Sequence, residues 1–152
     1  MQIETLKDVL HWTKEFHQHL SQCLSHCADK HADERAKMML EYLSEHEKTL
    51  TDVIGGFEKS GDENALNTWC YEYASHHPIT LHAHCDAPFA DLGTAQIMEV
   101  IVDQHRQVIE LYRYLASRAD IPSAKELLEN LHSLEEHEVM RMSQSSNRFT
   151  DL

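Results

Sequence analysis

Apolar residues recur three and four positions apart along four long stretches of the chain, the spacing that gathers side chains on one face of an α-helix. This periodicity predicts helices over about residues 2–28, 33–59, 95–119 and 123–145. Only 4 Gly and 3 Pro occur among the 152 residues, so few breaks are available for strands and tight turns. We therefore predict an all-α fold.

The connections between these helices differ greatly in length. Asp33 is a suitable N-cap for the second helix, and Ser123 with Glu126 forms the capping-box pattern at the start of the fourth. The short links before these caps require each pair of helices to form an antiparallel hairpin. The segment 60–94 is long enough to run the whole length of a bundle, and it includes a short predicted helix. The chain, 1–152, is thus expected to be a single four-helix-bundle domain in which two hairpins are joined by a long crossover.

One ionisable residue interrupts the predicted apolar face near the middle of each long helix. These four residues are His17, Glu47, His105 and Glu138. Antiparallel pairing brings each histidine level with a glutamate, to within about one helical turn. Burial of two carboxylates costs several kcal/mol unless their charge is compensated, and a transition-metal ion such as Fe, Mn or Zn compensates it well. The four residues are therefore candidate metal ligands in the core of the bundle.

A metal-free arrangement of the same polar layer is the alternative. Arg141 lies one turn beyond Glu138 on the same predicted face, and it would neutralise Glu138 or Glu47. In that arrangement the bundle would serve as an interaction or dimerisation module. A predicted face displaced by one residue would turn His46 or His137 inward instead.

Leu43-x-x-x-Glu47 and Leu134-x-x-x-Glu138 place a glutamate after a leucine in the same way on the second and fourth helices. Together with the two hairpins and the crossover, this pattern resembles the ferritin-like superfamily, particularly its rubrerythrin-like members, over nearly the whole chain. The resemblance implies a ferritin-like four-helix bundle. Members hold two irons through a glutamate on the first and third helices and a Glu-x-x-His pair on the second and fourth. Their irons react with oxygen or peroxide, and that is the chemistry which the resemblance implies.

This chain departs from the ligand set of the family. Glu47 and Glu138 match the glutamate of each Glu-x-x-His pair. The residues three positions later are Leu50 and Arg141, so both histidines of the motif are absent. The two histidines of the polar layer fall near the positions where the family has carboxylates on the first and third helices. The resemblance therefore carries the fold, whereas the function depends on the site.

Two further groups of metal-ligating side chains occur in the sequence. Along the first helix a four-residue spacing relates His19, Cys23, Cys27 and His31. Thiolates with imidazoles suit Zn or Cu(I), whereas buried cysteines beside solvated histidines would be ordinary packing. The crossover contains a second group, formed by His76, His77, His82, His84, Cys85 and Asp86. This group is rich in donors but has no recognised ligand spacing, and metal handling through the crossover is a further alternative.

The composition limits the partners that we expect. A net charge of -13 argues against nucleic acid and against anionic membrane surfaces. No apolar run approaches the length of a bilayer span, and the N-terminal residues show no secretory signal. The 4 cysteines lack zinc-finger spacing and suggest reduced thiols in a cytoplasmic protein. Bundles of this kind often pair through the flank of a hairpin, so a homodimer is expected by analogy.

Overall fold

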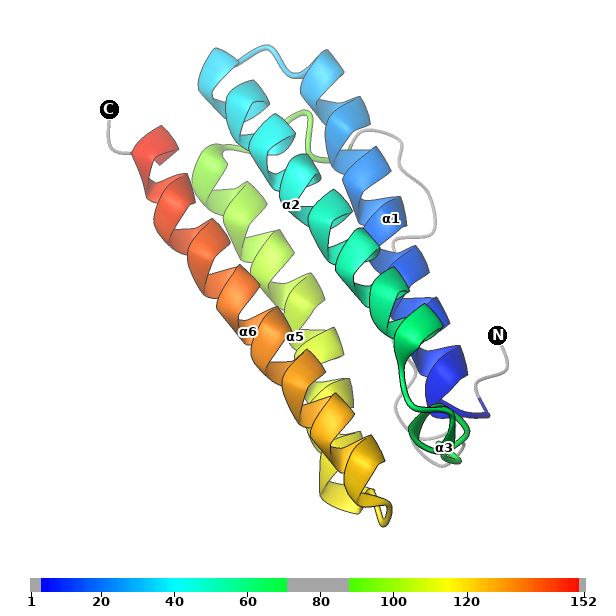
Figure 1. The fold of residues 1–152 in the computed structure, drawn as a ribbon. Coiled ribbons are helices and arrows are strands. Elements are labelled where there is room, and N and C mark those ends of the chain that lie inside the picture. The colour runs from blue at the N-terminus through cyan, green and yellow to red at the C-terminus, as the bar shows by residue number, and fades with distance from the viewer. Residues whose placement is uncertain (1–3, 71–87, 151–152) are drawn as a thin grey trace.

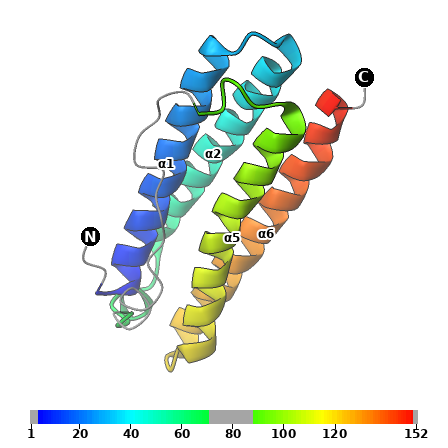
Figure 2. The same ribbon diagram turned by 180° about the vertical axis from the view of Figure 1, so that it is seen from behind.

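The structure is a computed structural model that describes residues 4–70 and 88–150. Its long helices, and the single-turn helix that follows the second of them, are α1 (Leu6–Lys30), α2 (Glu34–Ser60), α3 (Glu63–Leu66), α5 (Thr94–Arg118) and α6 (Pro122–Thr150). The long helices lie side by side as a bundle, with α1 and α2 forming one antiparallel hairpin and α5 and α6 the other (Figures 1 and 2). The α2 helix ends at the end of the bundle where α3 lies, and α5 begins at the opposite end (Figure 1). The predicted all-α bundle of two hairpins is therefore confirmed.

The starts of the helices follow from their capping residues. Thr5 and Asp8 cap α1 reciprocally, because Thr5 Oγ1 accepts from Asp8 N at 3.4 Å and Asp8 Oδ2 accepts from Thr5 N at 3.1 Å. Asp33 caps α2 as predicted, with its Oδ2 accepting from Ala36 N at 3.3 Å. The α6 helix begins at Pro122, whose fixed φ suits the first helical position. The predicted capping-box serine consequently lies inside the first turn of α6 and not at its N-cap.

The C-terminal end of α6 differs from the prediction. The sequence predicts an end near residue 145 and a frayed polar tail, whereas the helix continues to Thr150. Ser146 and Phe149 are buried, and the ring of Phe149 lies 6.0 Å from the ring of Tyr42 on α2. One aromatic anchor thus stabilises an otherwise polar last turn by burying apolar surface against another helix.

The buried face of α6 is displaced by one residue from the predicted face. On α1 the predicted inward residues from Leu6 to Cys27 are buried. On α6 the buried residues are Ala124, Leu128, Leu131, Glu135, Glu138, Met142, Ser146 and Phe149. Three residues predicted to face inward are only partly buried or exposed, namely Leu127, Leu134 and Arg141. The displacement changes which carboxylate α6 presents to the core.

The two ends of the crossover are tied to the first hairpin. In the first part of the crossover, Cys70 N donates to the carbonyl oxygen of Glu4 at 2.7 Å. In its last part, His31 Nε2 donates to the carbonyl oxygen of Leu92 at 2.8 Å. These bonds hold the described ends of the crossover against the two ends of α1.

The outward faces of the long helices are predominantly polar. Large apolar side chains that are exposed within the described ranges are scattered, and they are Met38, Val53, Trp69, Ile121 and Met140. Across residues 4–70 and 88–150, none of the helices combines the length and the apolar character that crossing a membrane requires.

Candidate metal centre

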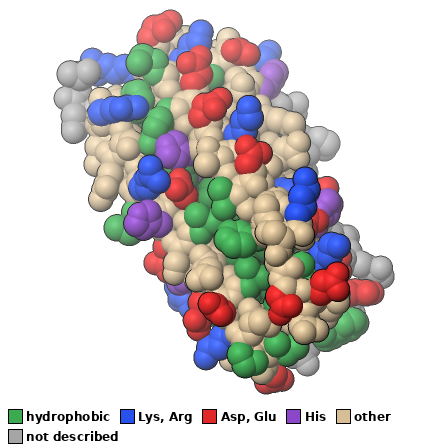
Figure 3. Space-filling view, viewed as in Figure 1, with side chains coloured by type: hydrophobic (Ala, Val, Ile, Leu, Met, Phe, Trp, Pro, Cys, Tyr) green, Lys and Arg blue, Asp and Glu red, His purple; other side chains and the backbone are tan. Residues whose placement is uncertain are grey.

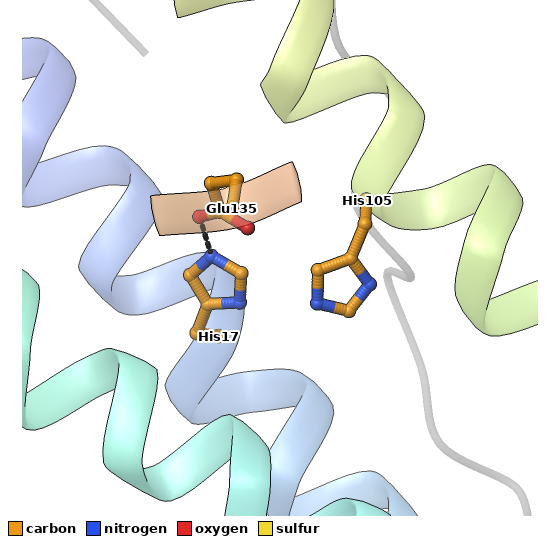
Figure 4. A group of neighbouring side chains, drawn as sticks. All are labelled: His17, His105 and Glu135. Atoms are coloured by element: carbon orange, nitrogen blue, oxygen red, sulfur yellow. Dashed lines mark hydrogen bonds and ion pairs between the residues drawn. The ribbon is translucent and has the colours of Figure 1, made fainter. Parts of the chain in front are cut away.

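Four fully buried ionisable side chains, one from each long helix, meet inside the bundle. They are His17 of α1, Glu47 of α2, His105 of α5 and Glu135 of α6, and each is 0% exposed. Figure 4 shows the His17 and His105 rings side by side with Glu135 next to His17, and the two ring centroids are 5.2 Å apart. Ionisable groups are buried this completely only when they are paired or bind an ion, so their contacts define the site.

The contacts form one continuous chain, which we call the core chain. Glu47 lies at its centre, with Oε2 2.7 Å from His17 Nδ1 and Oε1 2.7 Å from His105 Nε2. His17 Nε2 continues the core chain to Glu135 Oε1 at 2.6 Å. At the other end, His105 Nδ1 donates to the carbonyl oxygen of Ile101 at 2.8 Å. The core chain therefore connects α5, α2, α1 and α6 and joins the two hairpins.

These contacts define the protonation of His17. A carboxylate only accepts hydrogen bonds, so both ring nitrogens of His17 donate and the ring is an imidazolium between Glu47 and Glu135. Burial lowers the pKa of His17, but the carboxylates of Glu135 and Glu47 together outweigh burial and raise this pKa from 6.5 to about 10. Burial raises the pKa of Glu47, but His105 and His17 outweigh it and lower this pKa from 4.5 to about 2. The pKa of His105 is raised, because Glu47 outweighs the opposing effect of burial.

Three atoms of the core chain have no hydrogen-bond partner within the described part of the protein. They are Glu47 Oε1, His105 Nε2 and Glu135 Oε2, and all three are buried. Glu47 Oε1 and His105 Nε2 are at ion-pair distance, yet they lack the alignment of a hydrogen bond. A buried polar atom left unsatisfied costs about 1–3 kcal/mol. Glu47 Oε1 and His105 Nε2 still attract one another at 2.7 Å, so Glu135 Oε2 is the atom that is left to receive an additional group.

The residues fit a single metal ion. Ligand atoms of His17, His105 and Glu135 all lie within 4.8 Å of one another. Two ligands of one tetrahedral ion lie roughly 3.4 Å apart, so the 2.6 Å contact between His17 Nε2 and Glu135 Oε1 would widen by roughly 0.8 Å. The Nδ1 atom of each ring is already held by an acceptor, Glu47 for one and the Ile101 carbonyl for the other. Acceptors in these positions are what orient histidines that bind metals.

The same residues do not fit a two-iron set. Such a set takes a glutamate from each of two helices and a Glu-x-x-His pair from each of the other two. Histidines replace the carboxylates on α1 and α5, and the residues three positions after Glu47 and Glu135 are Leu50 and Glu138. The core chain thus offers two carboxylates where two irons use four.

The structure brings together three of the four residues that the sequence singles out. His17, Glu47 and His105 lie in the core chain, but Glu138 does not. Glu138 Oε2 lies 3.1 Å from His46 Nδ1, and Glu138 Oε1 accepts from Arg141 at 3.3 Å. The sequence interpretation therefore misplaced the α6 carboxylate, since Glu135 occupies that position in the core chain.

The error on α6 has a simple cause. The face through Leu134 carries two charged residues, Glu138 and Arg141, and the face through Glu135 also carries two, Glu135 and Glu138, so periodicity alone does not choose between them. Leu128 and Met142 mark the alternative face, which is equally continuous along the helix. These two residues are the one signal in the sequence that favours Glu135. The contact that selects it is with His17, which lies on α1, far away in the chain.

Of the two pairings predicted for Arg141, the structure has the one with Glu138 and not the one with Glu47. The Arg141 side chain is 61% exposed, and its ion pair is with Glu138, whose side chain is 11% exposed. His46 lies at the edge of the core beside Glu138, and His137 is exposed. The positive charge within the core chain comes instead from His17.

The two other candidate groups contribute no site that the structure describes. Cys23 is disulfide-bonded, so the expectation of four reduced thiols is wrong at this position. Cys27 is buried, and burial raises the pKa of its thiol although backbone hydrogen bonds from Phe89 and Ala90 oppose the shift. The two cysteines therefore do not form a shared thiolate site. The histidine-rich crossover group, within 76–86, lies outside the described residues.

A buried pair of hydroxyl groups adjoins the core chain. Tyr112 Oη donates to Thr13 Oγ1 at 2.8 Å, and Thr13 Oγ1 donates to the Leu10 carbonyl oxygen at 3.1 Å. Burial raises the pKa of Tyr112, and the negative charge of Glu135 raises it further. Tyr112 is thus a neutral phenol close to the α6 carboxylate, and its proton is already engaged by Thr13.

Comparison with known proteins shows the fold and does not identify an activity. No protein-family model matches the chain, and no curated protein matches it. The fold is similar to the crystal structure of a Thermotoga maritima protein provisionally described as a ferritin-like diiron-carboxylate protein. The TM-score is 0.66, the sequence identity is 10%, and the similarity covers 97% of each chain. The chain therefore adopts a ferritin-like fold, and its core carries a buried His/Glu group suited to a metal.

Proposed function

We propose that the chain binds one transition-metal ion in the core of its bundle, through His17, His105 and Glu135. The carrying observation is that ligand atoms of His17, His105 and Glu135, from three helices, are buried within 4.8 Å of one another. Glu47 has a different role in this proposal. Its Oε2 holds His17 Nδ1, which leaves Nε2 directed at Glu135.

The donor set suggests which ions would bind. Two imidazoles and one carboxylate with open positions are typical of mononuclear non-haem Fe(II) centres, and Zn and Mn accept the same donors. An iron ion held in this way would supply the binding and activation of oxygen or peroxide. The Thermotoga maritima protein of similar fold is described as a diiron-carboxylate protein, which supports a metal in such a bundle.

The polypeptide would perform two tasks at this site. The proton on His17 Nε2 must leave before that nitrogen can bind a cation, because a protonated imidazole offers no lone pair. Buried apolar residues one turn away, such as Leu43 and Val108, exclude water from the site. The site would thus exchange a buried proton for a metal in a dry environment, with Glu47 holding the orientation of His17 throughout.

A second candidate function is supported by the charge balance. If His17 and His105 are both imidazolium ions, they neutralise Glu47 and Glu135, and each nitrogen has an acceptor within 2.8 Å. The core chain would then be a structural network, and the bundle would be a metal-free interaction or dimerisation module. The buried Glu135 Oε2, which has no hydrogen-bond partner among the described residues, is the observation that favours the metal.

Elemental analysis separates the two functions. We expect untagged protein, reconstituted anaerobically with Fe(II) or with Mn²⁺ or Zn²⁺ and then desalted, to retain about one ion per chain. His105→Ala and Glu135→Gln should each lose most of this ion. Glu136→Gln removes the same charge from the next residue of α6, which is exposed, and it should retain the ion.

The histidine-rich crossover requires its own control. A His82→Ala, His84→Ala double variant should retain the tightly held ion if the core binds it. Loss of the ion in this variant, with retention in His105→Ala, would assign metal binding to the crossover. Wild-type protein that retains no ion would favour the metal-free module.

A further inference from the structure

A second His–Glu pair lies between the core chain and the solvent, on the side where α2 faces α6. His46 of α2 and Glu138 of α6 are 3.1 Å apart, and their side chains are 19% and 11% exposed. His46 precedes Glu47 in the chain, and Glu138 follows Glu135 by one helical turn. This pair, which we call the outer bridge, therefore lies beside the core chain and is more exposed than the core carboxylates.

An open hollow adjoins the outer bridge. It has a volume of about 540 Å³ and is lined by Arg35, Met38, Glu41, Tyr42, Glu45, Arg148 and Phe149. The ring of Tyr42 lies 4.5 Å from the ring of His46, so one lining residue of the hollow contacts the outer bridge. Figure 3 shows the α2–α6 side of the molecule, where charged side chains of both signs border exposed apolar ones. The charged residues that line the hollow are two glutamates, Glu41 and Glu45, and two arginines, Arg35 and Arg148, so the lining favours neither sign of charge.

Glu138 is held from the outside by an arginine that is free to move. Its contact with Arg141 is 3.3 Å long, and the Arg141 side chain is 61% exposed. Ion pairs of this exposed kind contribute little to stability and exchange readily. Behind Glu138 on the same helix, Glu135 Oε2 is buried and has no hydrogen-bond partner in the described structure.

The α1–α2 side is closed differently. Ser21 Oγ donates to the Ser44 carbonyl oxygen at 2.9 Å, and Ser44 Oγ donates to the Ser21 carbonyl oxygen at 2.8 Å. These reciprocal bonds join α1 to α2 one helical turn from His17 and Glu47. No charged group takes part in these bonds, although His26, Asp29 and Glu45 line the surface hollow that Ser21 and Ser44 also line.

We propose that the outer bridge is the access route of the metal centre. A divalent cation that arrives from solvent displaces the exposed Arg141 from Glu138, is held briefly by Glu138 and His46, and passes to Glu135 in the core. This inference rests on the proposed function, but it concerns the rate of loading and not the final occupancy. Glu138 is then a transient ligand of the cation, and Arg141 slows loading because its positive charge must first leave Glu138.

Loading of Co²⁺ into the metal-stripped full-length protein tests the route, because bound Co²⁺ absorbs visible light. We expect Glu138→Gln to slow loading by roughly tenfold while the final stoichiometry stays at one ion per chain. Arg141→Gln should accelerate loading. Arg141 is exposed, so this variant should fold normally, and it tests the route even if Glu138→Gln folds poorly. Glu136→Gln, which makes the same charge change on the exposed side of α6, should load at the wild-type rate.

The outcomes separate the two proposals. Equal loading rates for Glu138→Gln and Glu136→Gln, or slower loading in Arg141→Gln, would overturn the access route and leave the metal centre standing. Loss of the bound ion in Glu138→Gln at equilibrium would also overturn it, because Glu138 would then be a permanent ligand. Wild-type protein that takes up no stoichiometric Co²⁺, Fe(II), Mn²⁺ or Zn²⁺ would overturn the metal centre and the route together.

Discussion

The core chain and the outer bridge use the same residue types on neighbouring positions of the same helices, yet their environments differ completely. His46 and Glu47 are adjacent on α2, and Glu135 and Glu138 are one turn apart on α6. Glu47 is fully buried and its pKa is lowered to about 2 by the two imidazoles. Glu138 instead shares its charge with a half-buried imidazole and an exposed guanidinium. Burial and partners, and not residue type, therefore decide which carboxylate is committed to the site and which is exchangeable.

The largest difference between the two regions should appear in stability. Glu47→Ala leaves buried imidazoles without their shared carboxylate, and the loss of one partner of a buried ion pair costs about 3–5 kcal/mol. Glu138→Ala should cost about 1 kcal/mol or less, because its partners remain in contact with water. Urea unfolding of the metal-free proteins, followed by circular dichroism, measures both values. Equal costs for the two substitutions would show that the core chain is not the stabilising network.

Metal addition should stabilise only proteins with an intact core chain. An ion present at 100 times its dissociation constant raises the free energy of unfolding by about 2.7 kcal/mol. We expect the corresponding rise in melting temperature for wild type and for Glu138→Gln, but none for His105→Ala. Differential scanning calorimetry with and without Zn²⁺ measures it. A rise in His105→Ala equal to that in wild type would place the ion elsewhere.

The pH dependence of the metal-free protein should report the core chain as well. The pKa of Glu47 is lowered from 4.5 to about 2, so its contribution to stability is complete above pH 4.5 and is lost as the pH falls towards 2. The pKa of His17 is raised from 6.5 to about 10, so its contribution is complete below pH 6.5 and is lost as the pH rises towards 10. Together they predict the greatest stability between pH 4.5 and 6.5.

Unfolding by urea at a series of pH values measures this profile. Glu47→Gln should flatten its acidic side. A wild-type profile that keeps rising between pH 6.5 and 10 would contradict the imidazolium assigned to His17.

The smallest effect is expected at the exposed end of the outer bridge. Arg141→Gln removes one ion pair whose arginine is 61% exposed, and such pairs contribute about 0–1 kcal/mol. Chemical unfolding should therefore hardly distinguish this variant from wild type, even though its metal-loading rate changes. A loss comparable to that of Glu47→Ala would mean that Arg141 belongs to the core network after all.

Much of the fold could be predicted from the sequence, because it depends on local patterns. The periodic apolar residues, the cap at Asp33 and the two short links determined four helices in two hairpins. The same periodicity placed His17, Glu47 and His105 on inward faces, since each stands in a row of apolar neighbours with no competing row beside it. Polar residues in such rows are conspicuous, and their convergence followed from antiparallel pairing alone.

Only the tertiary structure decided what depends on contacts between helices. On α6 two rows of residues compete, and the choice of Glu135 over Glu138 follows from the position of His17 Nε2 on α1, which no pattern within α6 encodes. The last turn of α6 is helical because Phe149 packs beside Tyr42, a contact between residues far apart in the chain. Periodicity determines which faces turn inward when one row dominates, whereas partners from other helices decide between rows that are equally apolar.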